Sequence, residues 1–227
     1  MGIKRVFVYS DPNLRAREPT PEESKEIKRG LDSAPYCYKL IHQVAIFPPI
    51  FLSEKRNYSG SADIPRTISI SLPIQNVSLD ELVNRSEEFK SVWKTLREYL
   101  RSIPIHECAH KIDSIIFDYY DEIKLLRSVP LGKLQENRHP LYQALSELAN
   151  LNYDGKKYEI NDKRFGKYFT EKISEYFAEL YATSRLLPEL LTDSERRFFD
   201  KLHNGLILDG EKFLAYVSKN RRTLLEN

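Results

Sequence analysis

Five consecutive residues, His106-Glu107-Cys108-Ala109-His110, carry side chains that could bind a metal ion and activate water. On a helix, two histidines four residues apart project from one face, about one turn from each other. This spacing allows both imidazoles to bind one metal ion, and Glu107 beside them could act as a general base. The sequence therefore predicts half of a catalytic metal site on a helix.

The third metal ligand has to come from elsewhere in the chain. A catalytic site of this kind usually has three protein ligands and one open position for water. In one large class of zinc proteases, a glycine and then a histidine follow the second histidine at fixed spacings. Those two positions hold Asp113 and Ile116 here, so this arrangement is excluded. The remaining option is a glutamate on a later helix.

The segment Ser174–Glu179 offers such a ligand. Glu175 and Glu179 are four residues apart, so a helix places both carboxylates on one face. One could bind the metal while the other holds the free ring nitrogen of a ligating histidine. The apolar neighbours indicate a buried helix, and buried carboxylates require partners. Tyr168 lies seven residues before Glu175, so on a continuous helix its phenol would share that face and could donate to an oxyanion.

Together these features resemble the catalytic domain of anthrax lethal factor and the related Pro-Pro endopeptidases, which are gluzincin zinc metalloproteases. The specific motifs of the resemblance lie at 106–113 and 168–179. It implies that the bound metal is zinc and that the substrate is a protein or peptide. It assigns His106, His110 and Glu175 as zinc ligands, Glu107 as general base, Tyr168 as transition-state stabiliser, Glu179 as the partner of a ligating histidine, and Asp113 as a supporting residue.

The resemblance also implies the fold and the place where substrate binds. We expect a single α+β domain over 1–227, mostly helical and zincin-like, with a small N-terminal sheet. Residues 1–75 would form a small α/β lobe, and 78–227 would form a helical lobe with the zinc site. In that family a peptide pairs with a strand ahead of the motif helix. That strand corresponds to about 67–72, with Ile68, Ser69 and Ile70 as substrate-binding residues.

Local patterns predict where the elements begin and end. Apolar or alternating runs are typical of strands, and they occur at 3–9, 38–47 and 66–72. The polar segment 56–63 contains a glycine and is typical of an exposed loop. Capping boxes predict helix starts at Thr20–Glu23, Ser78–Glu81 and Thr192–Glu195, the first of these helices ending by Gly30.

Three further expectations concern the helices that position the site. Pro104 cannot donate a backbone hydrogen bond, so we expect a break at Ser102–Ile103. A new helix would then start near Pro104 and run to about Tyr120. Another helix should cover about 167–187, and a last amphipathic helix should cover 210–225.

Composition excludes several classes of protein. Charged residues make up 30% of the chain, hydrophobic ones 41%, and the net charge is +2. This balance gives no reason to expect binding to nucleic acid or to an acidic membrane surface. There is no apolar run long enough to span a bilayer, and Met1–Val6 lacks a secretory signal. We therefore expect action in the cytoplasm, or delivery by a route that needs no such signal. Cys37 and Cys108 do not suggest a disulfide framework and are expected to be buried thiols.

Three functions are compatible with these patterns. The favoured one is an active zinc endopeptidase of the lethal-factor type, acting as a toxin or effector. The second is a cytoplasmic regulatory metalloprotease similar to the ImmA/IrrE group, which the sequence Leu186-Leu187-Pro188 supports. No helix-turn-helix is evident, which disfavours the DNA-linked members. The third is an inactive interaction module with a metalloprotease fold, which the presence of Glu107 and Tyr168 argues against.

Overall fold

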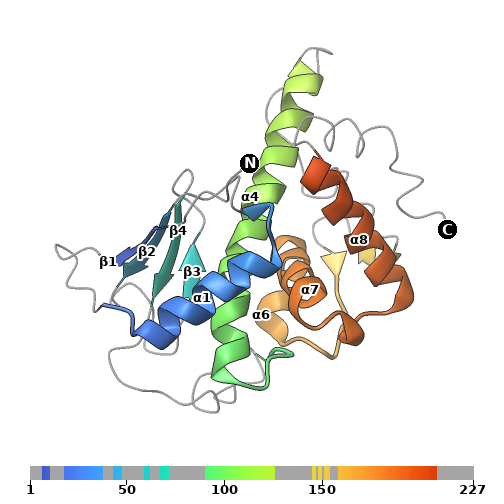
Figure 1. Ribbon diagram of the computed structural model, residues 1–227. Coiled ribbons are helices and arrows are strands. Elements are labelled where there is room, and N and C mark those ends of the chain that lie inside the picture. Colours follow the sequence, from blue (N-terminus) through green and yellow to red (C-terminus); the bar gives the residue numbers. More distant parts are fainter. Residues whose placement is uncertain are drawn as a thin grey trace.

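The helix that carries the two motif histidines, α4 (Leu96–Leu125), passes through the middle of the computed structural model (Figure 1). A sheet lies on one side of it, and helices α7 (Ile173–Leu186) and α8 (Asp193–Leu208) lie on the other. Among the described residues, helices predominate as expected, and no helix combines the length and apolar character needed to cross a bilayer. The structure describes residues 7–10, 18–37, 43–47, 59–61, 67–71, 90–125, 145–146, 148–149, 151–153 and 158–208.

Helix α1 (Pro21–Ser33) packs against α4 and begins at the predicted capping box. The backbone N–H of Thr20 donates to Glu23 at 2.8 Å, and that of Glu23 donates to the Thr20 hydroxyl at 3.2 Å. The helix continues past Gly30, where it was predicted to stop. A Cβ atom at Gly30 would overlap the carbonyl of Arg101, so this glycine allows α1 to lie directly against α4.

A buried ion cluster joins the same two helices. Glu26 on α1 is 2% exposed and accepts hydrogen bonds from Arg29, at 2.8 Å, and from Arg101 on α4. Burial alone would raise the pKa of Glu26, but the two guanidinium groups outweigh it and lower that pKa. A buried carboxylate with charged partners on two helices fixes how α1 sits along α4.

The sheet has the strand order β1-β2-β4-β3. Strands β1 (Phe7–Ser10), β2 (Gln43–Phe47) and β4 (Thr67–Ser71) are parallel and lie within the predicted segments, except that β1 extends to Ser10. Strand β3 (Ser59–Ser61) pairs antiparallel with β4. The prediction of a loop is therefore wrong at Ser59–Ser61. Its serines and glycine resemble a turn, and only pairing with β4 makes the segment a strand.

Strand β4, which was predicted to bind substrate at a sheet edge, is an inner strand of the described sheet. It is paired on both sides, with β2 through the register Ile68 to Val44 and with β3 through the register Ile70 to Gly60. The side chains of Ile68 and Ile70 are fully buried in the core. Ser69 and Ile70 are paired in both ladders, so the backbone of these two residues is not free to pair with a substrate. In the described part of the sheet, β3 is the outer strand beside α4.

Pro104 lies inside α4 and does not break it. The predicted break at Ser102–Ile103 is therefore wrong, and the helix that bears the motif starts earlier, at Leu96. Residues 102–109 are all buried between α1 and α7. Proline removes one backbone hydrogen bond from a helix, and packing on two neighbouring helices offsets that loss.

The predicted helix over 167–187 consists of two helices. Helix α6 (Lys167–Thr170) is a single turn, and α7 starts at Ile173 after a break at 171–172. The capping box at Thr192 is confirmed, because its backbone N–H donates to Glu195 at 2.8 Å and its hydroxyl accepts from the Glu195 N–H at 3.2 Å. The helix start predicted at Ser78 and the helix predicted over 210–225 lie outside the described residues, and the described segment 90–95 is not helical.

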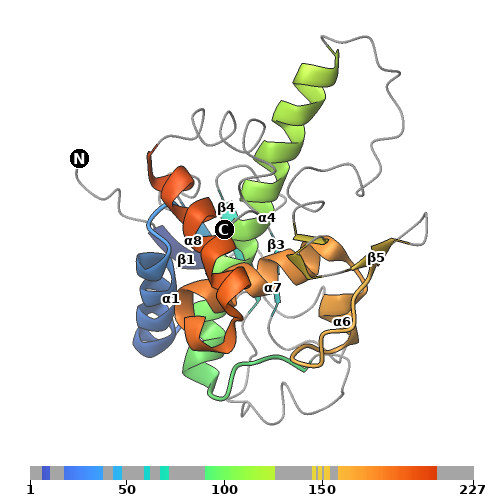
Figure 2. The ribbon, with the colours of Figure 1, turned by 90° about the vertical axis from the view of Figure 1, so that its right-hand side faces the viewer.

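A small hairpin lies in the segment between α4 and α6. Its strands are β5 (Asn152–Tyr153) and β6 (Tyr158–Glu159), and they pair antiparallel. Turned by 90°, the structure shows this hairpin on the same side of α4 as α6 (Figure 2). Tyr158 and Ile160 belong to the buried core, so the hairpin is joined to the helical part of the domain.

The stability of the protein should depend on the protonation of His203 on α8. Burial, and then the charge of Arg185, lower the pKa of this imidazole to about 4 from 6.5, although Asp200 opposes the shift. Between these two pH values the unfolded chain binds a proton that the folded protein does not. The free energy of unfolding should therefore fall as the pH decreases from 6.5 to 4, by at most on the order of 3 kcal/mol.

Urea denaturation of the wild type and a His203→Gln variant at several pH values measures this effect. The variant should lose the part of the pH dependence that lies between 6.5 and 4, whatever its stability at neutral pH. Identical pH profiles for the two proteins would show that His203 does not titrate differently in the folded and unfolded states.

Candidate metal site

The side chains of three predicted ligands converge between α4 and α7. Nε2 of His106 lies 3.2 Å from Nε2 of His110 and 3.2 Å from Oε2 of Glu175. Nε2 of His110 lies 3.7 Å from the same carboxylate oxygen. Two ligands come from one helix and the third from its neighbour, so the packing of α7 on α4 creates the site. Glu175, rather than Glu179, is the carboxylate that joins both histidines.

Glu179 lies beside the second ring nitrogen of His106. Its Oε2 atom lies 3.1 Å from Nδ1 of His106, and the residue is 2% exposed. Its second oxygen accepts a hydrogen bond of 2.7 Å from the indole N–H of Trp93. Trp93 lies just ahead of α4, in a non-helical segment. No local pattern predicts this contact, since Trp93 and Glu179 are 86 residues apart.

The carboxylates strongly influence the charge of the ligands. Burial lowers the pKa of His106, but hydrogen bonds to Glu175 and Glu179 outweigh it and raise this pKa to about 10. Burial also opposes ionisation of Glu175, yet the two histidines hold its pKa well below its usual range. These shifts favour a protonated His106 imidazole beside an ionised Glu175 carboxylate. A metal cation would replace that proton as the positive charge.

Two acidic residues of the motif remain to be located, Glu107 and Asp113. Glu107 is 6% exposed, and its charge contributes to the raised pKa of His106, so its carboxylate lies close to the ligands. The backbone of Asp113 is helical in α4, but its side chain lies outside the described residues. Glu107 is therefore the acidic residue of the motif that the structure places beside the histidines.

Tyr168 does not share a helix with Glu175, because the break at 171–172 separates α6 from α7. Its ring packs edge-on against Phe169, with centroids 5.2 Å apart. Phe169 in turn packs edge-on against the imidazole of His106, at 6.1 Å. The predicted shared helical face is therefore wrong. Instead, the short helix α6 places Tyr168 one aromatic ring away from a ligand.

A polar cluster holds the segment that leads into α6. The guanidinium of Arg164 bonds to both Asp162, at 2.6 Å, and Glu195 on α8. The phenol of Tyr176 on α7 donates to Asp162 at 2.9 Å. Burial would raise the pKa of Asp162, but hydrogen bonds from Arg164 outweigh it and lower this pKa. These bonds hold the segment that precedes α6, and with it Tyr168, against α7 and α8.

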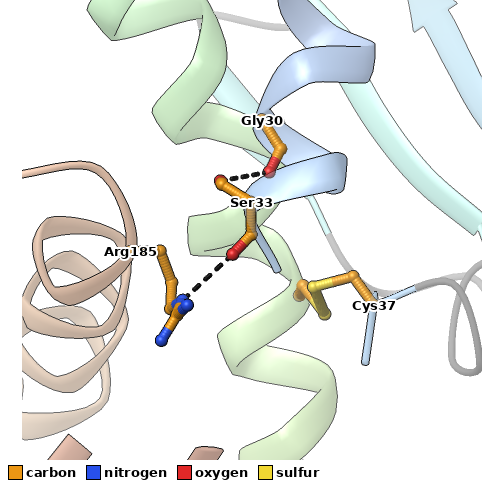
Figure 3. The surroundings of a disulfide bond; sticks show 5 residues. Gly30, Ser33, Cys37 and Arg185 are labelled. Carbon is orange, nitrogen blue, oxygen red and sulfur yellow. Dashed lines mark hydrogen bonds between the residues drawn. A yellow bond between two sulfur atoms is a disulfide. The ribbon is translucent and has the colours of Figure 1, made fainter. Parts of the chain in front are cut away.

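The two cysteines form a disulfide, so the prediction of two buried thiols is wrong. Cys37 follows α1 and bonds to Cys108, which lies within the histidine motif on α4, with Cα atoms 5.9 Å apart. Both residues are fully buried. Nearby, the Ser33 hydroxyl donates to the carbonyl of Gly30, and Arg185 donates to the Ser33 carbonyl (Figure 3). A pair of cysteines 71 residues apart carries no pairing signal in the sequence, since only the fold brings them together.

No protein-family model, no curated protein and no solved structure matches this chain. The geometry of the site therefore has to indicate the function. Three possible ligand atoms, from His106, His110 and Glu175, all lie within 4.8 Å of one another. This group could hold a metal ion.

Proposed function

We propose that the protein is a zinc-dependent endopeptidase in which His106, His110 and Glu175 bind the zinc ion. The observation that carries this proposal is the spacing of the three ligand atoms. Two ligands at about 2.0–2.1 Å from a tetrahedral zinc ion lie about 3.3–3.4 Å from each other. The three separations here are 3.2, 3.2 and 3.7 Å. These separations are close to those expected for three ligands of one zinc ion.

The types of ligand favour zinc and hydrolysis. Two imidazoles and one carboxylate form a ligand set of zinc hydrolases, which leaves a fourth position for water. Magnesium and calcium prefer sites made only of oxygen atoms. The partner of the ligating His106 is also of the usual type, because a carboxylate, Glu179, faces its second ring nitrogen.

Residues of the chain would carry out the proton transfers. Zinc bound at the site would lower the pKa of water to about 7 and polarise a peptide carbonyl. Glu107, buried beside His106, would accept the proton of the attacking water and deliver it to the leaving amine. Tyr168, one aromatic ring away from His106, would donate a hydrogen bond to the developing oxyanion.

The outer strand β3 is the place where an extended peptide would bind. Strand β4 is an inner strand of the described sheet, whereas β3 is the outer strand that contacts α4. A peptide that adds to a sheet edge gains affinity from main-chain hydrogen bonds. The substrate would therefore pair with Ser59–Ser61 rather than with Ile68, Ser69 and Ile70.

The disulfide favours an endopeptidase outside the reducing cytoplasm over a cytoplasmic regulator of the ImmA/IrrE type. Disulfides form and persist in oxidising compartments and are rare in the cytosol. One of the two bonded cysteines, Cys108, lies between His106 and His110, so the disulfide is part of the segment that would bind the metal.

Zinc content and peptide cleavage together test the proposal. Purified protein should hold one zinc ion per chain and cleave members of a peptide library. A chelator should stop cleavage, and added zinc should restore it. Glu175→Gln should lose the metal, whereas Glu171→Gln, at an exposed position just before α7, should retain it. Absence of zinc binding, or bound zinc without cleavage of any peptide, would contradict the proposal.

A further inference from the structure

We propose that Trp93 is a positioning residue for the metal site, and that it acts on His106 through the carboxylate of Glu179. The inference rests on the proposed zinc function and deepens it. Three groups form one continuous series of hydrogen bonds. The Trp93 indole N–H donates to Oε1 of Glu179 at 2.7 Å, and Oε2 of Glu179 lies 3.1 Å from Nδ1 of His106.

The indole of Trp93 determines which groups donate and which accept in this series of hydrogen bonds. The N–H of tryptophan only donates, so it fixes Oε1 of Glu179 as an acceptor. The carboxylate then presents its other oxygen to Nδ1 of His106 and accepts a hydrogen bond from an N–H there. An imidazole that carries its proton on Nδ1 has a free lone pair on Nε2, which is the atom facing His110 and Glu175. Trp93 therefore supports the ring orientation that metal binding needs.

Burial makes the contact hard to replace with water. Trp93 is 3% exposed and Glu179 is 2% exposed. A buried carboxylate oxygen that lacks a hydrogen-bond donor destabilises the fold, and the indole supplies that donor. A residue that only filled space here would need no N–H pointing at a carboxylate. The short bond to Glu179 therefore separates a positioning role from simple packing.

The backbone around Trp93 is itself anchored. The carbonyl of Lys90 accepts a hydrogen bond of 2.7 Å from the Gly166 N–H, which joins this segment to the start of α6. The Lys94 and Thr95 N–H groups donate to the carboxylate of Glu98 at 2.8 and 3.1 Å. These bonds hold the segment on both sides of Trp93. The indole thus has a fixed position from which to orient Glu179.

Trp93 is also the single tryptophan of the chain, which allows a direct test. A ¹⁵N-labelled sample should give one indole N–H resonance, and it should exchange slowly with solvent because the group is buried and bonded to a carboxylate. Glu179→Gln should shift this resonance, since it replaces the charged acceptor with a neutral one. Adding Zn²⁺ to the wild type should also shift it, through His106 and Glu179.

Zinc affinity provides the second measurement. Trp93→Phe keeps an aromatic ring but removes the donor, and it should weaken Zn²⁺ binding by about 10-fold in competition with a chelator. Tyr181→Phe is the matched control, because it removes a buried hydroxyl from the same helix as Glu179, two positions further along. This control should bind Zn²⁺ as the wild type does. Unchanged affinity in Trp93→Phe would overturn the inference.

The two measurements separate this inference from the proposed function. If the wild type binds no Zn²⁺, the proposed function fails and the positioning role fails with it. If Zn²⁺ binds but no peptide is cleaved, the endopeptidase proposal fails, and the affinity of Trp93→Phe still decides the role of Trp93. An indole resonance that Glu179→Gln leaves unshifted would show that the two residues are not bonded in solution, and would overturn the inference by itself.

Discussion

Replacing Glu107 with glutamine should lower the rate of peptide hydrolysis by about 10²–10⁴-fold while leaving the zinc content unchanged. The amide has nearly the same shape as the carboxylate but cannot accept a proton from water. Because Glu107 is not one of the three residues whose ligand atoms converge, the metal should remain bound. The measurement is kcat/KM on a peptide cleaved by the wild type, together with zinc per chain in the same preparations.

Two further variants serve as controls for Glu107→Gln. Glu175→Gln should lose both zinc and activity, and Glu171→Gln should retain both. A loss of activity with retained zinc in Glu107→Gln therefore identifies a group that moves protons rather than one that binds metal. Hydrolysis by Glu107→Gln at the wild-type rate would show that another group is the base.

Removing the disulfide should have the largest effect on stability. A cross-link between Cys37 and Cys108 closes a loop with a sequence separation of 71 residues. On the chain-entropy account, losing a cross-link of this length raises the freedom of the unfolded chain and destabilises the fold by about 4 kcal/mol. A double Cys37→Ala/Cys108→Ala variant should therefore show a lower free energy of unfolding in urea.

Reduced wild type is the control for the sulfur atoms themselves. Unfolded in the presence of a dithiol, it lacks the cross-link but keeps both side chains, so its lower stability measures the bond alone. The difference between reduced wild type and the double variant measures the packing of two fully buried side chains. Oxidised wild type as unstable as the reduced protein would contradict the expected contribution of the bond.

The sequence predicts the metal site better than the fold around it. His106 and His110 are recognisable because helical spacing places both on one face. Asp113 and Ile116 exclude one source of a third ligand, and the resemblance to a known family singles out Glu175. The capping boxes at Thr20 and Thr192 are equally local, since each involves residues three positions apart. Such patterns are decided within one helical turn, and a single sequence records them.

The incorrect predictions share a different cause, because distant parts of the chain decide each of those features. Pro104 is buried within a helix that packs against both α1 and α7. Ser59–Ser61 becomes a strand because β4 offers it a partner, and that pairing also closes the edge expected for substrate. The bond between Cys37 and Cys108 and the contact of Trp93 with Glu179 join positions 71 and 86 residues apart. Long-range packing overrides local preference at each of these places.

The disulfide has a consequence for the rotation of α4 about its own axis. Successive helical residues turn by about 100°, so Cys108 projects roughly opposite to His106 and His110. On one side, α4 therefore contacts α7 through the candidate metal ligands. On the opposite side, the disulfide joins α4 to Cys37, just after α1. We expect this disulfide to oppose any rotation of α4 that would turn the histidines away from Glu175. Zinc would therefore enter a site whose two histidines already face Glu175, and its loss would leave the helix in the same orientation.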